Sequence, residues 1–101
     1  MSRRIDLDAV LRALGHPDRR RFVAACRDTP RAAGDLAALS SLSLATVSEH
    51  LKVLRTAGLL VLHRDGRSWI YRADPAVLES AAAAIGALAE QPVGRLRQRV
   101  A

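Results

Sequence analysis

The chain has 101 residues, of which half are hydrophobic, and a net charge of +6 at pH 7. That length holds one small domain. No apolar run is long enough to span a membrane, and the charged start is not followed by the apolar segment of a signal peptide, so a cytoplasmic protein is expected. The charge, from fifteen Arg and one Lys, favours an anionic partner, nucleic acid first, without locating its site, although a solvated basic surface would explain it equally well.

The first part of the chain predicts two helices. Residues 5–14 carry an apolar residue at nearly every helical turn and end at Gly15, as a helix with a C-terminal glycine does. Pro17 and Asp18 suit the first turn of the second helix, because proline is preset for that turn and a carboxylate favours its positive end. Pro30 disfavours helical geometry just before it, so this helix should end near residue 28.

The single cysteine limits the chemistry of the chain. Within "RRFVAAC", Phe22, Val23 and Cys26 share one helix face, so Cys26 is interpreted as a small core residue. One cysteine excludes a disulfide within the chain and a Cys-rich metal site. A redox role for Cys26 is left open, although no resolving cysteine exists.

Residues 32–60, "AAGDLAALSSLSLATVSEHLKVLRTAGLL", predict two further helices with a short break at Ser40-Ser41. Leu36 and Leu39 are expected to give the first of them its core contacts. Ser43 is a plausible N-cap for the second, and Gly58 closes it. The inner face of this second helix is predicted to comprise Leu44, Val47, Leu51 and Leu54. Its outer face and flank are predicted to comprise Ala45, Thr46, Ser48, Glu49, His50, Lys52 and Arg55.

After Gly58 the periodicity changes from helix to strand. "LLVLH" and "SWIYR" flank "RDGR", where Asp65-Gly66 predicts a two-residue hairpin turn with Arg64 and Arg67 at its tip. A last helix is expected from Pro75, capped by the preceding Asp, to about residue 91. Residues 1–91 would then form the domain, and 92–101 a basic, frayed tail.

The order helix, helix, helix–turn–helix, hairpin, helix predicts a mostly α fold with a small β-hairpin: a winged helix–turn–helix. In this fold the second helix of the pair enters the major groove of DNA, where short polar side chains can approach base edges. Arginines at the wing can reach phosphates or a minor groove; an ordinary solvated turn is the alternative. The predicted DNA-binding residues are Ser43, Leu44, Ala45, Thr46, Ser48, Glu49, His50, Lys52, Arg55, Arg64 and Arg67.

Three segments carry a family resemblance: "LRALGHPDRRRFV", "DLAALSSLSLATVSEHLKVLRTAGLL" and "HRDGRSWIYRAD". Over residues 7–90 the chain resembles the ArsR/SmtB family of bacterial winged-helix repressors. The resemblance implies a homodimer, formed through the first and last helices, that binds a palindromic DNA operator and represses transcription. It also implies DNA contacts at Leu44, where many relatives carry a polar residue; a leucine can offer a base only apolar contact, such as to a thymine methyl.

The apolar faces of the first and last helices are the candidates for that dimer interface, because unpaired apolar faces need burial. Core packing within one chain is the alternative for each. The candidate interface residues are Ile5, Leu7, Val10, Leu11, Leu14, Val77, Leu78, Ala81, Ile85 and Leu88.

The sequence favours neither a metal cofactor nor an enzyme. The cysteine pair of one family metal site is absent, and Glu79 and Glu90, about 16 Å apart along the last helix, cannot share an ion within one chain. His16, His50 and His63 lie on different predicted elements. No catalytic triad or phosphate-binding loop is present. Two alternatives stay open for the control of the protein: an unknown small-molecule effector in the dimer interface, or no effector and control by protein abundance. A protein-interaction module without DNA binding is the alternative function.

Overall fold

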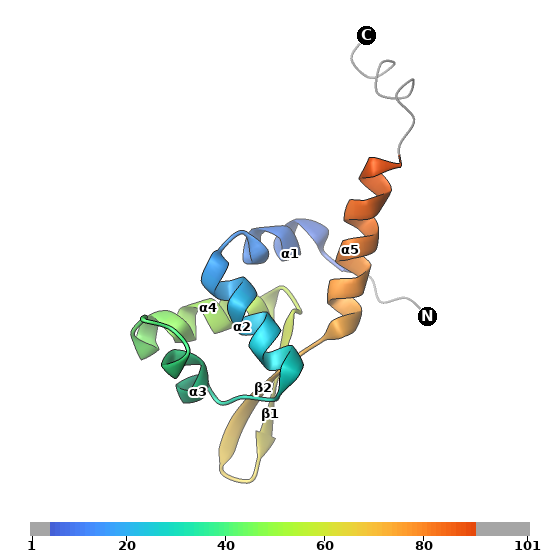
Figure 1. The fold of residues 1–101 in the computed structure, drawn as a ribbon. Coiled ribbons are helices and arrows are strands. Elements are labelled where there is room, and N and C mark those ends of the chain that lie inside the picture. The colour runs from blue at the N-terminus through green and yellow to red at the C-terminus, as the bar shows by residue number, and fades with distance from the viewer. Residues whose placement is uncertain (1–4, 91–101) are drawn as a thin grey trace.

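The computed structural model describes residues 5–90, which form five helices and a two-stranded hairpin in the predicted order. Four helices pack into a body, the hairpin projects from it, and the last helix leads away on another side (Figure 1). None of the described helices has the length and hydropathy to cross a bilayer. The elements are α1 (Leu7–Leu14), α2 (Pro17–Asp28), α3 (Ala33–Ala38), α4 (Leu44–Thr56), β1 (Leu60–Asp65), β2 (Ser68–Ala73) and α5 (Pro75–Ala89).

Short-range hydrogen bonds set where the helices begin. The side chains of Asp6, Ser43 and Asp74 accept backbone N–H groups at the starts of α1, α4 and α5, as the sequence predicts for the latter two. His16 does the same for α2, where its Nδ1 accepts the N–H of Asp18. Each cap satisfies a donor that has no partner within its helix, so the polar residues between helices fix the boundaries.

The core lies where α1, α2, α3 and α4 meet the base of the hairpin and the start of α5. Its fully buried members include Phe22, Leu36 and Leu51. Cys26 belongs to it, as predicted, at 3% exposure. Leu39 was expected in it but is 46% exposed, because α3 ends at Ala38 and the turn carries Leu39 outward.

The turn between α3 and α4 is held by a serine. The Ser40 hydroxyl donates to the carbonyl of Ala37 and accepts the N–H of Leu42, both at 3.2 Å. The hydrogen bond from the Leu42 N–H orients Leu42, which is half-buried and packs against the core. The predicted break at Ser40-Ser41 is therefore an ordered turn that sets α3 against α4.

The hairpin pairs β1 with β2 in antiparallel register, with Leu60 opposite Ala73 and Asp65 opposite Ser68. This register makes Gly66 and Arg67 the two central residues of the turn. The prediction of an Asp65-Gly66 turn is thus wrong by one residue. Gly66 has φ +62° and Arg67 does not have positive φ, which is the pattern of a type II′ turn with glycine first.

The hairpin is also tied to the body at its second strand. Arg31, between α2 and α3, exchanges two backbone hydrogen bonds with Tyr71, at 3.0 and 2.7 Å. At the base of the hairpin, Leu59 and Leu60 are buried. The base of the wing is therefore fixed while its tip projects.

Candidate nucleic-acid interface

The outer face of α4 is open, as predicted. Leu44, Ala45, Thr46, Ser48 and the other predicted contacts are exposed, with one exception described below. Leu44 is 55% exposed, so its predicted place on the inner face is wrong. The helix is held from its other side by Val47, Leu51 and Leu54, which are fully buried. The exposed set on and before α4 comprises Ser43, Leu44, Ala45, Thr46, Ser48, Glu49, Lys52 and Arg55.

The first turn of α4 is preorganised by its cap. Ser43 Oγ accepts the N–H of Thr46 at 3.2 Å and lies 3.1 Å from the Thr46 hydroxyl, to which it donates. Both hydroxyls remain exposed, so each keeps acceptor capacity toward solvent or a ligand. Ser48 lies two residues further on, about 200° around the helix from Thr46, and is also exposed.

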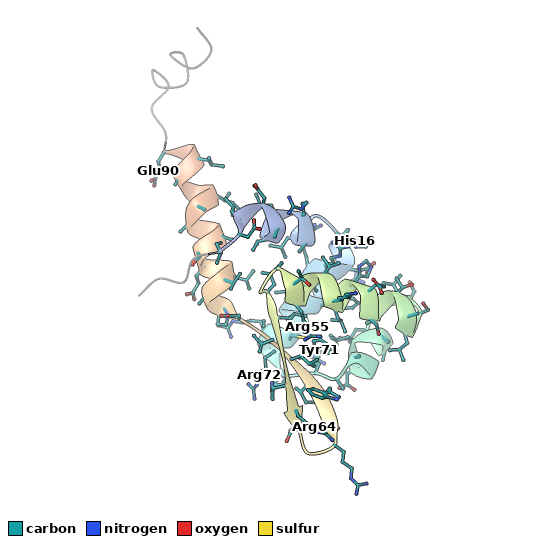
Figure 2. All side chains as sticks on the ribbon, turned by 180° about the vertical axis from the view of Figure 1, so that it is seen from behind. His16, Arg55, Arg64, Tyr71, Arg72 and Glu90 are labelled. Carbon is teal, nitrogen blue, oxygen red and sulfur yellow. The ribbon has the colours of Figure 1, made fainter. Side chains whose placement is uncertain are left out.

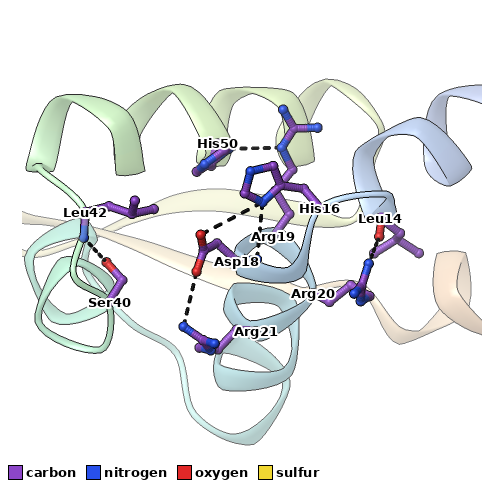
Figure 3. A network of polar contacts seen from close by, with 9 residues as sticks. All are labelled: Leu14, His16, Asp18, Arg19, Arg20, Arg21, Ser40, Leu42 and His50. Atoms are coloured by element: carbon purple, nitrogen blue, oxygen red, sulfur yellow. Dashed lines mark hydrogen bonds and ion pairs between the residues drawn. The ribbon is translucent and has the colours of Figure 1, made fainter.

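His50 is the exception. The sequence predicts it on the exposed flank, but its side chain is directed at the start of α2 and the residue is 9% exposed. Its ring lies 4.4 Å from the ring of His16 and 6.3 Å from that of Phe22, centroid to centroid. Arg19 Nε donates to His50 Nδ1 at 3.0 Å (Figure 3). The prediction that His50 is exposed is wrong, and we remove it from the DNA-binding set.

The surroundings of His50 favour the neutral imidazole. Burial lowers its pKa most, and the charges of His16 and Arg19 lower it further, while Asp18 acts in the opposite sense. A neutral ring that accepts at Nδ1 carries its proton on Nε2. His50 therefore holds α4 against α2 through packing and one hydrogen bond.

The wing carries exposed arginines in two different states. The guanidinium of Arg64 lies 5.5 Å from the centroid of the Trp69 ring, and its Nε donates to the carbonyl of Gly66 at 3.0 Å. Trp69 is directly opposite Arg64 across the hairpin and 53% exposed. Arg67 occupies the turn itself and is exposed. Arg64 is thus restrained against the strands, and Arg67 is the cation at the tip.

Two other residues were missed at the wing. Trp69 contacts the Arg64 guanidinium, because the two residues are directly opposite in the hairpin register. The predicted turn at Asp65-Gly66 implies a different register, so it did not place Trp69 opposite Arg64. Arg72, further along β2, is exposed and has its Nε 3.5 Å from His63 Nε2. Figure 2 shows Arg64 and Arg72 on the hairpin, and the strand register puts their side chains on opposite faces of it. Arg72 is therefore an exposed arginine of the wing that was not among the predicted residues.

The candidate dimer residues divide into two groups. Val10, Val77 and Ala81 are buried within the chain, at 0%, 2% and 2% exposure, so for these three core packing within one chain is the correct alternative. The remainder are exposed or half-buried: Ile5, Leu7, Leu11, Leu14, Leu78, Ile85 and Leu88.

The two carboxylates of the last helix were considered as possible metal ligands. Glu79 and Glu90 are both exposed, and no group of metal-binding side chains in the described part of the chain includes either of them. The predicted end of the helix near residue 91 is close to the observed end at Ala89, with Glu90 as the cap. The tail at 92–101 lies outside the described residues.

Comparison with known proteins gives a consistent answer. The family model of a helix-turn-helix domain matches residues 14–63. An ArsR-like transcriptional regulator from Rhodococcus sp. RHA1 aligns over 91% of this chain and 90% of its own, at 27% identity and a TM-score of 0.77. A possible transcriptional regulator for arsenical resistance aligns over 88% and 93%, at 32% identity and a TM-score of 0.71.

A third structure, the cadmium metal-sensor CMTR from Mycobacterium tuberculosis, is 37% identical and aligns over 71% of this chain and 75% of its own, with a TM-score of 0.62. No curated protein sequence is significantly similar to the chain. The ArsR-like structures match the fold over nearly the whole described chain, and their family consists of transcription regulators, not enzymes. The chain belongs to the ArsR/SmtB family of winged helix–turn–helix, DNA-binding transcriptional regulators.

Proposed function

We propose that the protein is a homodimeric repressor that acts in the cytoplasm and binds a two-fold symmetric operator with α4 and the wing. The observation that carries the proposal is the open outer face of α4, which presents short polar side chains and two cations beside a projecting, arginine-tipped hairpin. The second helix of such a pair fits the major groove, and a wing can reach adjacent phosphates.

The contacts divide by chemistry. Ser48 and Thr46 carry hydroxyls that can bond bases or phosphates, and Glu49 can accept from the amino group of cytosine. Leu44 offers only apolar contact, which suits a thymine methyl. Lys52 and Arg55 lie further along the exposed face, where phosphates are the natural partners. Base readout is therefore concentrated in the first two turns of α4.

Dimerisation is supported by the exposed end of the α5 apolar face. Ile85 and Leu88 are 47% and 64% exposed, on the same helix as buried Val77 and Ala81. A second copy of the chain would cover them, and a dimer with a two-fold axis requires an operator with the same symmetry. A repressor then acts by occupying that operator.

Selection of bound sequences from a random duplex library tests the proposal directly. A two-fold symmetric consensus is expected, with half-sites about one helical turn, or about 10–10.5 base pairs, apart. Selection in parallel with chelator and with added metal ions tests whether an ion changes the sequence bound. Failure to enrich any sequence would contradict specific DNA reading, and an asymmetric consensus would contradict the symmetric dimer. A reporter gene placed behind the consensus then tests repression.

The contact surface is tested with Ser48→Ala against Ser80→Ala, a matched change on α5. Loss of one hydroxyl hydrogen bond in each half-site, worth about 0.5–1.5 kcal/mol apiece, should weaken operator binding by about five- to 150-fold for Ser48→Ala. Ser80→Ala should leave operator binding unchanged. His50→Ala is unsuitable for this purpose because His50 is buried and its loss would perturb the fold. Equal operator affinity of Ser48→Ala and the unaltered protein in a gel-shift titration would remove this face from the interface.

A further inference from the structure

Three side chains with metal-binding groups meet where α2 begins against the middle of α4. One nitrogen each of His16 and His50 and one carboxylate oxygen of Asp18 lie within 4.8 Å of one another. Figure 3 shows them directed toward the space between the two helices. His16 and Asp18 are close in the sequence, at the start of α2, whereas His50 belongs to α4, so the fold is needed to bring it beside them.

The donors fit a transition-metal ion by type. Two imidazoles and a carboxylate are the set that zinc and its neighbours in the first transition row accept, and three protein ligands leave a fourth position for water. Both imidazoles use Nδ1 as an acceptor here, from the Asp18 N–H at 3.3 Å and from Arg19 Nε at 3.0 Å. Each ring thus directs a lone pair, not an N–H, at a positively polarised group.

The geometry needs only side-chain adjustment. Ligands about 2.1 Å from a tetrahedral zinc ion lie about 3.4 Å from one another, so the three atoms must approach by at most about 1.4 Å. His50 is fixed by burial, but the side chains of His16 and Asp18 are 42% and 23% exposed. These two can rotate, and the exposed edge of His16 gives an ion a path from solvent.

Three existing contacts oppose the ion, and each is replaceable. Arg19 must leave His50, and its side chain, only half-buried, can turn to solvent. Arg21 contacts the Asp18 carboxylate at 3.1 Å, but this is an ion pair between residues three apart with Arg21 56% exposed, which contributes little. The His16 cap of α2 is a long bond at 3.3 Å. Arg19 is therefore the main competitor, because a guanidinium and a dication cannot both approach His50.

We propose that His16, Asp18 and His50 form a binding site for a divalent transition-metal ion of the zinc type, joining α2 to α4. The site is separate from the open face of α4, since His50 lies on the side of the helix that faces the body. An ion there cross-links two helices that otherwise meet through packing and the Arg19–His50 bond. Metal binding should consequently raise the midpoint of thermal unfolding, because the ion binds the folded chain alone.

Titration of the full, tag-free chain with Co²⁺, followed by visible absorption, tests the site. One Co²⁺ per chain with tetrahedral ligand-field bands, displaced by Zn²⁺, is expected. His16→Gln and Asp18→Asn should each weaken Co²⁺ binding by at least about tenfold, because even loss of a group that only orients a ligand costs that much. His63→Gln is the matched control, since His63 lies on the hairpin beside Arg72 and outside the cluster; it should bind Co²⁺ as the unaltered chain does.

A diagnostic variant is Arg19→Ala. Removal of the competing cation should tighten Co²⁺ binding, whereas a merely structural role for the cluster predicts no such gain. Circular dichroism of each metal-free variant confirms that it is folded, and the tests avoid changing His50 for that reason. No Co²⁺ bound by the unaltered chain, unchanged binding in folded His16→Gln, or weaker binding in folded Arg19→Ala would each overturn the site. These outcomes are independent of DNA binding, which is measured separately in chelator.

Discussion

The Cys26 thiol lies in the core at 3% exposure, and burial raises its pKa from 9.0 to about 11, against a smaller lowering by Arg31. The thiolate is the reactive form, so this rise in pKa reduces the thiolate fraction at neutral pH by about a hundredfold. We expect iodoacetamide to label the folded protein at about pH 8 very slowly, and the same protein in urea at the ordinary rate. Because Cys26 is the only cysteine, the mass of the labelled protein reports this site alone.

Raising the pH should accelerate labelling of the folded chain only as pH approaches 11, and that of the unfolded chain already near 9. Similar labelling rates in the folded and unfolded states at neutral pH would contradict the burial of the thiol. They would also reopen the redox role that the sequence left as an alternative.

The position of His50 was predicted wrongly because a polar side chain was expected to be exposed. His50, Leu51 and Leu54 lie three, four and seven residues after Val47, so periodicity alone puts His50 on the buried face. Its polarity suggested an exposed position instead. The partner that makes burial tolerable, Arg19, comes from a different helix. No local pattern in the sequence discloses such a pairing, and for the same reason the cluster with His16 was not predicted.

Gly58 connects α4 to β1 in a conformation that other residues adopt at a cost. It has φ +83°, and a Cβ at this position would lie 3.8 Å from the nearest atom, a methyl of Val77. Space is therefore sufficient, and strain comes from the backbone alone. Gly58→Ala should lower the free energy of unfolding by about 1–2 kcal/mol.

The matched control is Gly34→Ala, in α3, where φ is not positive and the added Cβ would meet no atom within 4 Å apart from its chain neighbours and the backbone of its own helix. Its free energy of unfolding should be unchanged or raised by up to about 1 kcal/mol. Denaturant unfolding of both variants measures the difference. A Gly58→Ala protein as stable as the control would mean that the link to the wing tolerates another backbone conformation.

The exposed arginine of the wing should contribute to the salt dependence of DNA binding. Arg67 lies at the exposed centre of the hairpin turn, whereas Arg64 is restrained by its aromatic contact. If Arg67 meets a phosphate, Arg67→Ala should weaken binding to operator and random duplexes alike. The slope of log affinity against log salt should become shallower by about 0.9 for each phosphate that is no longer neutralised, hence by about twice that in a symmetric dimer.

Arg27→Ala provides the control, because Arg27 is an exposed arginine of α2 and so belongs neither to α4 nor to the hairpin. It changes the net charge equally and should leave the slope nearly unchanged. An equal change of slope in both variants would mean that the wing acts only through the overall charge of the protein.

The predicted elements agree with the structure in number, type and order, because each has its own local signal: a cap, an apolar period or a turn glycine. The hairpin turn shows the limit of such signals. Asp-Gly is a strong turn dipeptide, but pairing of the whole strands fixes the register, and it places Gly66 first in the turn. Leu44 is a second example: it continues the apolar period of α4, which predicted burial, but it lies beyond the end of the core and is exposed.

At the level of the whole molecule, the apolar face of α5 extends beyond the part of the helix that the core covers. Val77, Ala81, Ile85 and Leu88 are spaced four, four and three residues apart and so share one face of the helix. The first two are buried, whereas the last two are 47% and 64% exposed, where α5 leads away from the body (Figure 1). The sequence pattern alone could not show where along this face the chain's own core ends.

The exposed half of this face gives a prediction about assembly. Ile85→Glu should weaken the proposed dimer, because the change removes a large apolar side chain worth about 1.5–3 kcal/mol and both copies carry it. The dimer dissociation constant should therefore rise by at least about a hundredfold, measured by sedimentation velocity over a range of protein concentrations. Operator affinity should fall with it, since a monomer contacts only one half-site.

Ala83→Glu is the matched control, an equal charge on the opposite side of α5, in line with the exposed Glu79. It should leave both the dimer and operator binding unchanged. If the Ile85→Glu variant stays dimeric, the dimer interface lies elsewhere, on α1 or the open side of α4. A protein that becomes monomeric yet binds the full operator as tightly would separate DNA reading from dimerisation, and the two-fold symmetry of the proposed complex would then be wrong.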